Sequence, residues 1–186
     1  MKYEKLKLGE ALGFWFEELT PEDWFKGGTE LDAEIAKRFS HIHAEVAAGE
    51  FWRYRTEAHA YLAEIVVLDQ FSRQIYRGDK KAFAYDGQAL LLAQQAVSLG
   101  FDLELEQAER QFLYMPFMHS ESKVIHGEAI KLFEALGVEE NIKFENIHKD
   151  IVDRFERYPH RNKVLGRENT EEETDYLANN HEVFFS

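Results

Sequence analysis

The chain contains no cysteine, which excludes disulfide bonds, thiolate zinc sites, iron–sulfur clusters and a cysteine nucleophile. It has 3 prolines in 186 residues and no low-complexity run, so it offers little room for linkers. No stretch approaches the about 20 apolar residues that a membrane span needs, and the charged N-terminus lacks the apolar segment of a signal peptide. We therefore expect a soluble, cytoplasmic protein with a single domain over residues 1–186 and no membrane partner.

Basic residues are scarce beside acidic ones: 22 Lys and Arg stand against 35 Asp and Glu, for a formal net charge of -13. Because a negative field repels polyanions, we expect no nucleic-acid partner. Hydrophobic residues make up 45% of the chain, enough for the sizeable core of a globular domain. Aromatic residues near the chain ends could pack in that core or in a homo-oligomer contact, namely Phe14, Trp15, Phe16, Trp24, Phe25, Phe184 and Phe185.

Helix signals recur along the whole chain, whereas the alternation of apolar and polar residues that is typical of strands is nearly absent. The stretch TPED at residues 20–23 combines an N-cap, a proline in the first turn and acids that complement the helix dipole. Thr170 and Glu173 have the spacing of a capping box. Such patterns predict helices that begin near residues 20, 29, 56, 86, 104, 121, 139 and 170, and glycines at 49, 78, 100 and 137 end four of them. The sequence predicts an all-α protein.

The spacing of the expected helices also indicates repetition. The starts near residues 86, 104, 121 and 139 form two pairs with corresponding starts 35 residues apart, close to the tetratricopeptide period of about 34 residues. Little of that repeat's consensus is present beyond Ala-x3-Phe at Ala108/Phe112 and Ala129/Phe133. The pattern favours a tetratricopeptide-like stack of antiparallel helical hairpins over regular tetratricopeptide repeats.

The stretch LDQFSRQIYRG, residues 68–78, places charge on an apolar helix stripe. Asp69 lies one turn beyond Ile65, and Arg73 follows at the spacing where a carboxylate and a guanidinium meet on one helix face. A buried carboxylate needs a partner, because desolvating a lone ion is costly. Arg73 either pairs internally with Asp69 or is oriented by Asp69 towards a ligand.

The stretch FLYMPFMHSES, residues 112–122, contains Pro116 in the last turn of an expected helix, which it should kink or terminate. His119, Ser120 and Glu121 follow where the next helix begins. Capping and the helix dipole explain Ser120 and Glu121. They do not explain His119, which titrates near neutrality and suits a proton carrier or a ligand contact.

The stretch RFERYPHRNKVLGR, residues 154–167, gathers five Arg or Lys against one acid around a proline. The arginines at 154 and 157 complement the C-terminal dipole of the preceding helix. Helix chemistry does not account for the residues beyond the proline, which include His160, Arg161, Asn162 and Arg167. The two arginines among them could pair with acids as a structural clasp, or could hold a carboxylate or phosphate in bidentate fashion.

Standard catalytic motifs are missing: the sequence has no Gly-rich phosphate loop, no G-x-S-x-G elbow and no H-E-x-x-H motif. His148 lies on the apolar face of a long helix, where a satisfied core histidine is the commoner interpretation. We expect no metal site and no cofactor, although His119, Glu121, His148 and His160 could converge in space. Catalytic residues and enzymatic activity stay open.

Five motifs make the chain recognisable: FWFEEL at 14–19, LDQFSRQIYRG at 68–78, AFAYD at 82–86, FLYMPFMHSES at 112–122 and HRNKVLGRENTEEE at 160–173. With them the sequence resembles a family of bacterial proteins classified as a domain of unknown function (number nine-two-four). Gln74, Phe117 and Glu156 depart from Asn, Leu and Gly, which are common at these positions in the family. The resemblance implies an all-helical, tetratricopeptide-like single domain. It implies no activity, because the family has no established biochemical role.

The leading hypothesis is a pocket for a small anionic ligand on the inner face of the helical stack. Its candidate residues are Asp69, Arg73, His119, Glu121, His160, Arg161, Asn162 and Arg167, with Tyr114, Phe117 and Tyr158 as apolar walls. The alternative is a tetratricopeptide-like module that binds a protein or an acidic peptide, with a purely structural charge cluster. A small closed pocket favours the first hypothesis, and an open groove favours the second.

Overall fold

The computed structural model describes residues 2–26 and 28–179, and these residues form helices and turns without a strand. The α-helices are α1 (Gly9–Gly13), α2 (Pro21–Lys26), α3 (Thr29–Ala47), α4 (Ala58–Ile65), α5 (Ser72–Ile75), α6 (Asp86–Ser98), α7 (Gln107–Met118), α8 (Lys123–Leu136), α9 (Glu139–Phe155), α10 (Asn162–Leu165) and α11 (Glu171–Asn179). Two π-helical segments, η1 (Phe14–Glu18) and η3 (Val66–Phe71), and the 3-10 segments η2 (Trp52–Tyr54), η4 (Lys80–Phe83), η5 (Phe101–Glu104) and η6 (Pro159–Arg161) extend or join them. The predicted all-α class is confirmed.

The capping chemistry expected from the sequence is present at several helix ends. Thr170 and Glu173 hydrogen-bond reciprocally, each backbone N–H donating to the other side chain. Gly137 follows α8 with a φ of 75°, in the left-handed region that favours glycine. Glu156 follows α9 in the same region with a φ of 60°, which costs a non-glycine residue about 1–2 kcal/mol. A glycine at this position would remove that cost.

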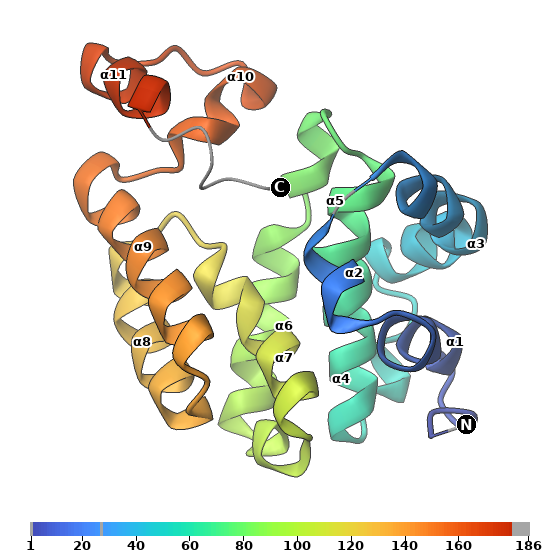
Figure 1. Ribbon diagram of the computed structural model, residues 1–186. Helices are drawn as coiled ribbons and strands as arrows, with labels where there is room; N and C mark the ends of the chain where they lie inside the picture. The colour runs from blue at the N-terminus through green and yellow to red at the C-terminus, as the bar shows by residue number, and fades with distance from the viewer. Residues whose placement is uncertain (1, 27, 180–186) are drawn as a thin grey trace.

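Consecutive helices pack side by side, so that the chain runs up and down through the molecule (Figure 1). The segments α4, η3 and α5 form one continuous helix over residues 58–75. In this stack α3 packs against α5, α6 against α4, α7 against α6, α8 against α7 and α9 against α8. After α9, the short helices α10 and α11 lie above α9 at the upper left of Figure 1. This return brings the C-terminal segment close to the end of α5.

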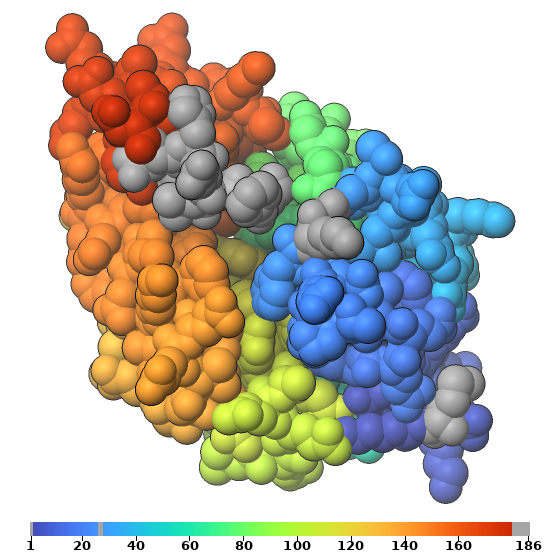
Figure 2. Space-filling model, viewed as in Figure 1, coloured from blue at the N-terminus to red at the C-terminus, as the bar shows by residue number. Residues whose placement is uncertain are grey.

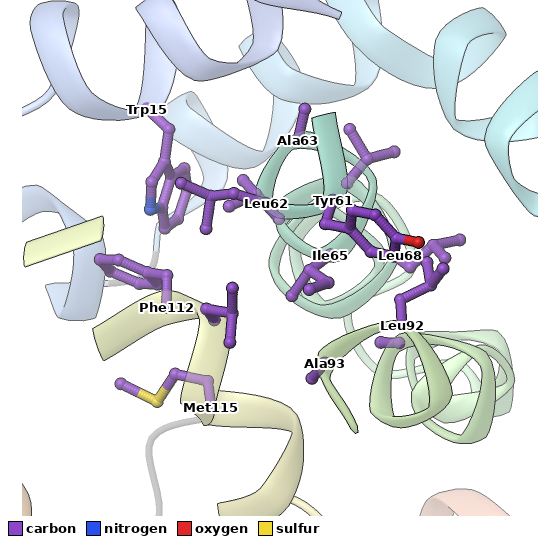
Figure 3. Packing of buried hydrophobic residues seen from close by; sticks show 14 of the residues in the cluster. Trp15, Tyr61, Leu62, Ala63, Ile65, Leu68, Leu92, Ala93, Phe112 and Met115 are labelled. Atoms are coloured by element: carbon purple, nitrogen blue, oxygen red, sulfur yellow. The ribbon is translucent and has the colours of Figure 1, made fainter. Parts of the chain in front are cut away.

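The hydrophobic core between the helices is rich in aromatic rings. Figure 3 shows Trp15 and Phe112 beside Leu62 of α4, and the two rings meet edge to face with 5.4 Å between centroids. Of the aromatic residues near the chain ends, Phe14 is buried and Phe25 is 56% exposed. Phe184 and Phe185 lie outside the described residues. Packing therefore explains most of the described aromatic residues, and the expected homo-oligomer stays a prediction.

A second, smaller apolar cluster lies between α9 and the C-terminal helices. Ile151, Val152 and Tyr158 are buried there, with Phe155 and Tyr176 packed against them. The C-terminal segment thus has apolar packing of its own beside the main core. The expectation of a single domain over residues 1–186 stays a prediction.

The last long helices form the expected hairpins, with α7 against α8 and α8 against α9. Their starts at Asp86, Gln107, Lys123 and Glu139 are unequally spaced, so tetratricopeptide-like repetition stays a prediction. Pro116 does not end α7 at once, since the helix runs on to Met118. No helix in the described part of the chain is long and apolar enough to cross a membrane.

Candidate functional site

The π-helical turn η3 interrupts the central helix at the stretch that the sequence singled out. It contains Asp69, and π-helical turns are frequent at functional sites. Asp69 is fully buried, and its carboxylate accepts hydrogen bonds from Gln70, Arg73 and His119. Several donors are expected, because an isolated buried carboxylate is costly. The buried ion cluster comprises Asp69, Arg73, Asp86, His119 and Arg161.

Arg73 lies at the centre of the buried ion cluster. Its Nη1 lies 3.2 Å from Oδ1 of Asp69, so the predicted pair at four-residue spacing is present. Its two Nη atoms also donate to the two carboxylate oxygens of Asp86, each at 3.1 Å, in the bidentate geometry that suits a guanidinium. Burial lowers the pKa of Arg73, but the two aspartates more than offset this, and the pKa is raised. Arg73 therefore joins the central helix to the first residue of α6.

Asp86 is a central member of the cluster that the sequence patterns did not select. At the start of α6 it looked like an ordinary acid in a first helical turn. The available signal was its place in the AFAYD motif at residues 82–86. No local rule shows that this aspartate faces an arginine from another helix.

Arg161 approaches the same carboxylate from the C-terminal segment. Its Nη1 lies 3.3 Å from Oδ2 of Asp86, so Asp86 is shared between two guanidinium groups. The guanidinium lies over the rings of Phe83 and Tyr158, 4.6 Å from each centroid, as in cation–π pairs. Its Nε is buried without a hydrogen-bond partner among the described residues. Burial lowers the pKa of Arg161, which is thus a desolvated and incompletely paired cation.

His119 forms an oriented pair with Asp69. Burial raises the pKa of Asp69, but Arg73 and His119 lower it more, to about 2. The ionised carboxylate can only accept, so Nδ1 of His119, 2.7 Å away, carries the proton and donates it. Burial and Arg73 lower the pKa of His119. Its Nε2 therefore keeps a lone pair at neutral pH, and an imidazole oriented by a carboxylate in this way can accept a proton.

A pocket of about 180 Å³ lies where the buried ion cluster approaches the surface. This C-terminal pocket is lined by Arg73, Arg77, Gly78, Ala82, Phe83, His160 and Val164. Arg77 is held at the rim by Asp32, which accepts from Nε at 2.6 Å and from Nη2 at 2.9 Å. The structure thus brings Arg73 and His160 together at one small pocket, with Arg161 next to His160 in the chain.

Two histidines near Arg161 are held neutral at pH 7. Burial lowers the pKa of His160 to about 3, and Arg161 adds to this effect. Burial lowers the pKa of His148 to about 4, against the opposing hydrogen bond to the backbone oxygen of Phe144. His148 is half-buried rather than fully in the core, and its ring meets Tyr158 edge to face.

Three of the candidate residues form a clasp instead of lining the pocket. Arg167 donates to the two carboxylate oxygens of Glu121 at 2.7 and 2.8 Å, and the backbone N–H of Tyr158 donates to Glu121 at 2.7 Å. Asn162 is fully buried and donates to Asn169 at 2.8 Å. The contacts of Glu121 tie the C-terminal segment to the turn before α8, the structural role that the sequence left open for the arginines. The Asn162–Asn169 hydrogen bond lies within that segment.

Sequence reasoning missed a fully buried pair between α8 and α9. Nδ1 of His126 lies 2.6 Å from Oε1 of Glu145, and Nε2 lies 2.9 Å from the backbone oxygen of Ser120 and 3.0 Å from the hydroxyl of Tyr158. Burial raises the pKa of Glu145. The two residues are 19 positions apart, on helices whose relative phase no motif indicates.

The expected aromatic walls are only partly where the hypothesis placed them. Tyr114 and Phe117 are buried on the inner face of α7, and the hydroxyl of Tyr114 donates to Asp102 at 2.6 Å. Tyr158 does lie beside the cluster, and Phe83 is the ring that lines the pocket. Among the described residues, no group of three or more His, Asp or Glu is arranged to hold a metal ion.

The comparisons with known proteins agree with the motifs. The model of a family of bacterial proteins of unknown function, DUF924, matches residues 11–181. The chain belongs to this family. It is similar to the solved structure of a protein of unknown function, ATU0120 from Agrobacterium tumefaciens, with 33% sequence identity over 92% of this chain and 97% of that chain and a TM-score of 0.88. No curated protein matches the chain. Membership of DUF924 therefore confirms the resemblance and leaves the activity to be argued from the site.

Proposed function

We propose that this DUF924 protein binds a small anion in the C-terminal pocket, beside Arg73 and His160. The observation that carries the proposal is a small pocket next to an incompletely paired, buried arginine. Arg161 shares the carboxylate of Asp86 with Arg73, and its Nε has no acceptor within the described part of the chain. A buried donor without an acceptor costs about 1–3 kcal/mol. An anion that supplies acceptors near these arginines would offset part of that cost.

The volume of the pocket suits a small ligand. Its volume of about 180 Å³ corresponds to roughly six water molecules at about 30 Å³ each. Sulfate, phosphate or a short carboxylate fits this space. The ligand class is therefore a small oxyanion.

The charges of the buried ion cluster balance before any ligand enters, because Arg73 and Arg161 face Asp69 and Asp86. An added anion needs a compensating positive charge in this poorly solvated place. His160 lines the pocket and is neutral, since burial and Arg161 lower its pKa to about 3. A bound anion raises that pKa. Anion binding is therefore expected to favour proton uptake at His160 as the pH falls from neutral to weakly acidic values.

The test is calorimetric titration of the purified protein with sodium sulfate. Sulfate keeps its charge at neutral and weakly acidic pH, so a proton taken up on binding belongs to the protein. Val164→Phe fills the pocket without removing a charge and is expected to abolish saturable binding. His160→Gln is expected to weaken binding severalfold and to remove the proton uptake, which is measured by comparing two buffers of different ionisation enthalpy.

The matched control is Arg154→Gln, which removes an exposed arginine paired with Glu172 outside the pocket. It is expected to bind sulfate like the parent, and thermal melting checks that each variant folds. The proposal is wrong if the parent shows no saturable binding of sulfate, phosphate or acetate. It is also wrong if folded Val164→Phe binds as tightly as the parent.

Recognition of an acidic peptide is the second candidate function. Figure 2 shows a furrow between the N-terminal helices and the α8–α9 hairpin, with α7 at its base. A tetratricopeptide-like stack would use such a concave surface for a peptide. An acidic hexapeptide that binds equally well to the parent and to Val164→Phe would favour this function over anion binding in the pocket.

A further inference from the structure

We propose a second binding site, independent of the C-terminal pocket, for a flat aromatic anion. It is a pocket of about 330 Å³ formed by the N-terminal turns, the connection between α3 and α4, and one face of α4. This N-terminal pocket is within the range of small-molecule sites. The N-terminal turns form the wall of this pocket, α4 forms its floor, and exposed cations lie at its rim.

The wall is held in place by contacts outside the pocket. Gly9 packs so closely on the preceding turn that a Cβ there would lie 1.9 Å from the backbone oxygen of Tyr3. The hydroxyl of Tyr3 and Nζ of Lys2 donate to Glu109 of α7 at 2.6 and 2.8 Å. The N-terminal turn is therefore anchored at both its start and its end. A preformed wall lowers the cost of ordering a binding site.

The floor of the pocket is apolar and carries little free negative charge. Leu8 is buried, and the small side chains of Ala60 and Ala63 leave space over α4. Glu64 borders this floor, but Arg55 donates to both of its carboxylate oxygens, at 2.7 and 2.8 Å. An apolar ring can therefore lie on the floor without facing an uncompensated carboxylate.

The rim carries cations that form no ion pair with the residues that the structure describes. Lys5, Lys7 and Arg53 are exposed, and within the described ranges none of the three forms an ion pair. Nζ of Lys7 lies over the ring of Tyr54 at 5.5 Å instead. Glu57 also lines the rim, and the three cations outweigh it. In a chain with a net charge of -13, this local excess of positive charge attracts anions.

Rings at the entrance complete the assignment to an aromatic anion. Tyr54 is 47% exposed, and Phe51 lies next to it with 6.1 Å between ring centroids. A flat ligand ring can stack on such a surface, while a carboxylate, phosphate or sulfonate on that ring reaches the lysines and Arg53. The site thus needs both halves of the ligand, a ring and a negative group.

The experiment titrates the full chain with naphthalenesulfonate, with naphthylmethanol as the ring alone and with methanesulfonate as the anion alone. Calorimetry is expected to show saturable binding of naphthalenesulfonate. Naphthylmethanol and methanesulfonate are each expected to bind at least tenfold more weakly. Lys7→Gln and Arg53→Gln are each expected to weaken the binding of naphthalenesulfonate severalfold and to leave the binding of naphthylmethanol unchanged. Ala60→Leu fills the floor and is expected to abolish binding, and Tyr54→Ala tests the ring surface without touching the core.

Lys131→Gln is the matched control, because it removes an exposed lysine that pairs with Glu128 elsewhere on the surface. Val164→Phe, which blocks the C-terminal pocket, is expected to bind naphthalenesulfonate like the parent, so the two proposals can fail separately. The inference is overturned if the parent shows no saturable binding. It is equally overturned if folded Ala60→Leu and Tyr54→Ala both bind like the parent.

Discussion

The C-terminal pocket and the N-terminal pocket of this DUF924 protein provide their cations with different partners. In the C-terminal pocket Arg73 lies against Asp86 and Arg77 lies against Asp32. In the N-terminal pocket Lys7 and Arg53 lie over the rings of Tyr54 and Trp52. Burial explains the partner of Arg73, because a desolvated cation needs a carboxylate. Water stabilises exposed cations such as Lys7 and Arg53. Arg77 at the rim is 37% exposed and pairs with Asp32 without that need.

The difference has a consequence for ligand binding. In the C-terminal pocket the charges already balance. An anion that binds there has to be accompanied by a cation or by a proton on the protein. An anion in the N-terminal pocket meets cations that form no ion pair with the described residues. Binding at the first pocket should therefore depend on pH, and binding at the second should depend mainly on salt.

The largest effect is expected from Asp69→Ala, which removes a carboxylate from the buried ion cluster beside the C-terminal pocket. It leaves Arg73 and His119 without the fully buried carboxylate that both contact. We expect the free energy of unfolding to fall by about 3–5 kcal/mol, measured by urea denaturation. The matched control is Asp153→Ala, an aspartate that pairs with Lys149 on the exposed face of α9. A loss below about 1 kcal/mol for Asp69→Ala would show that the cluster does not behave as a buried ion network.

Gly9→Ala is expected to have the next largest effect and to act on the N-terminal pocket alone. The new Cβ would collide with the backbone oxygen of Tyr3, so the N-terminal turn has to move. We expect a loss of about 1–3 kcal/mol in unfolding free energy, together with weaker naphthalenesulfonate binding and unchanged sulfate binding.

Gly127→Ala is the control for that substitution, because a Cβ at this helical glycine of α8 meets nothing within 4 Å. It is expected to stabilise the protein by about 0.5–1 kcal/mol. If Gly9→Ala is as stable as the parent, the N-terminal turn is not fixed by close packing against Gly9.

The pH dependence of stability tests whether the histidines beside the C-terminal pocket are held neutral. The pKa of His148 is lowered to about 4 and that of His160 to about 3, from an ordinary value of 6.5. The unfolded chain therefore binds more protons below pH 6.5, and stability falls as the pH drops towards these values. Each histidine contributes a slope of about 1.4 kcal/mol per pH unit.

Denaturation midpoints between neutral and weakly acidic pH measure that slope. His160→Gln and His148→Gln are each expected to flatten it, whereas Arg154→Gln is expected to keep it. An unchanged slope in the double variant His148→Gln/His160→Gln would show that other groups govern the acid sensitivity.

The smallest effect, a severalfold change in affinity, compares the two pockets directly. As the pH falls from neutral to weakly acidic, sulfate is expected to bind more tightly, because protonated His160 compensates its charge. The affinity for naphthalenesulfonate is expected to change less than twofold over the same pH range. Added sodium chloride is expected to weaken naphthalenesulfonate binding more than sulfate binding. If the two ligands respond alike in paired titrations, the contrast between the pockets is wrong.

The candidate site was predictable from the sequence where it depends on neighbours along one helix. Asp69 and Arg73 form the expected pair because residues four apart on a helix lie on one face. The partner that Arg73 shares with Arg161 was not predictable, since Asp86 lies 75 positions from Arg161. Tyr114 and Phe117 were expected at the pocket, and α7 instead turns them into the core.

The sequence by itself determined the helical class, the positions of caps such as Thr170 with Glu173, and membership of the family. These features depend on local hydrogen bonds, backbone conformation and motif content, all of which short stretches contain. Only the tertiary structure decided which charges are buried together, which arginine forms a clasp, and where the C-terminal and N-terminal pockets lie. The reason is physical: burial and pairing depend on how distant helices stack, and the free energy of an ion depends on those surroundings more than on its neighbours in the chain.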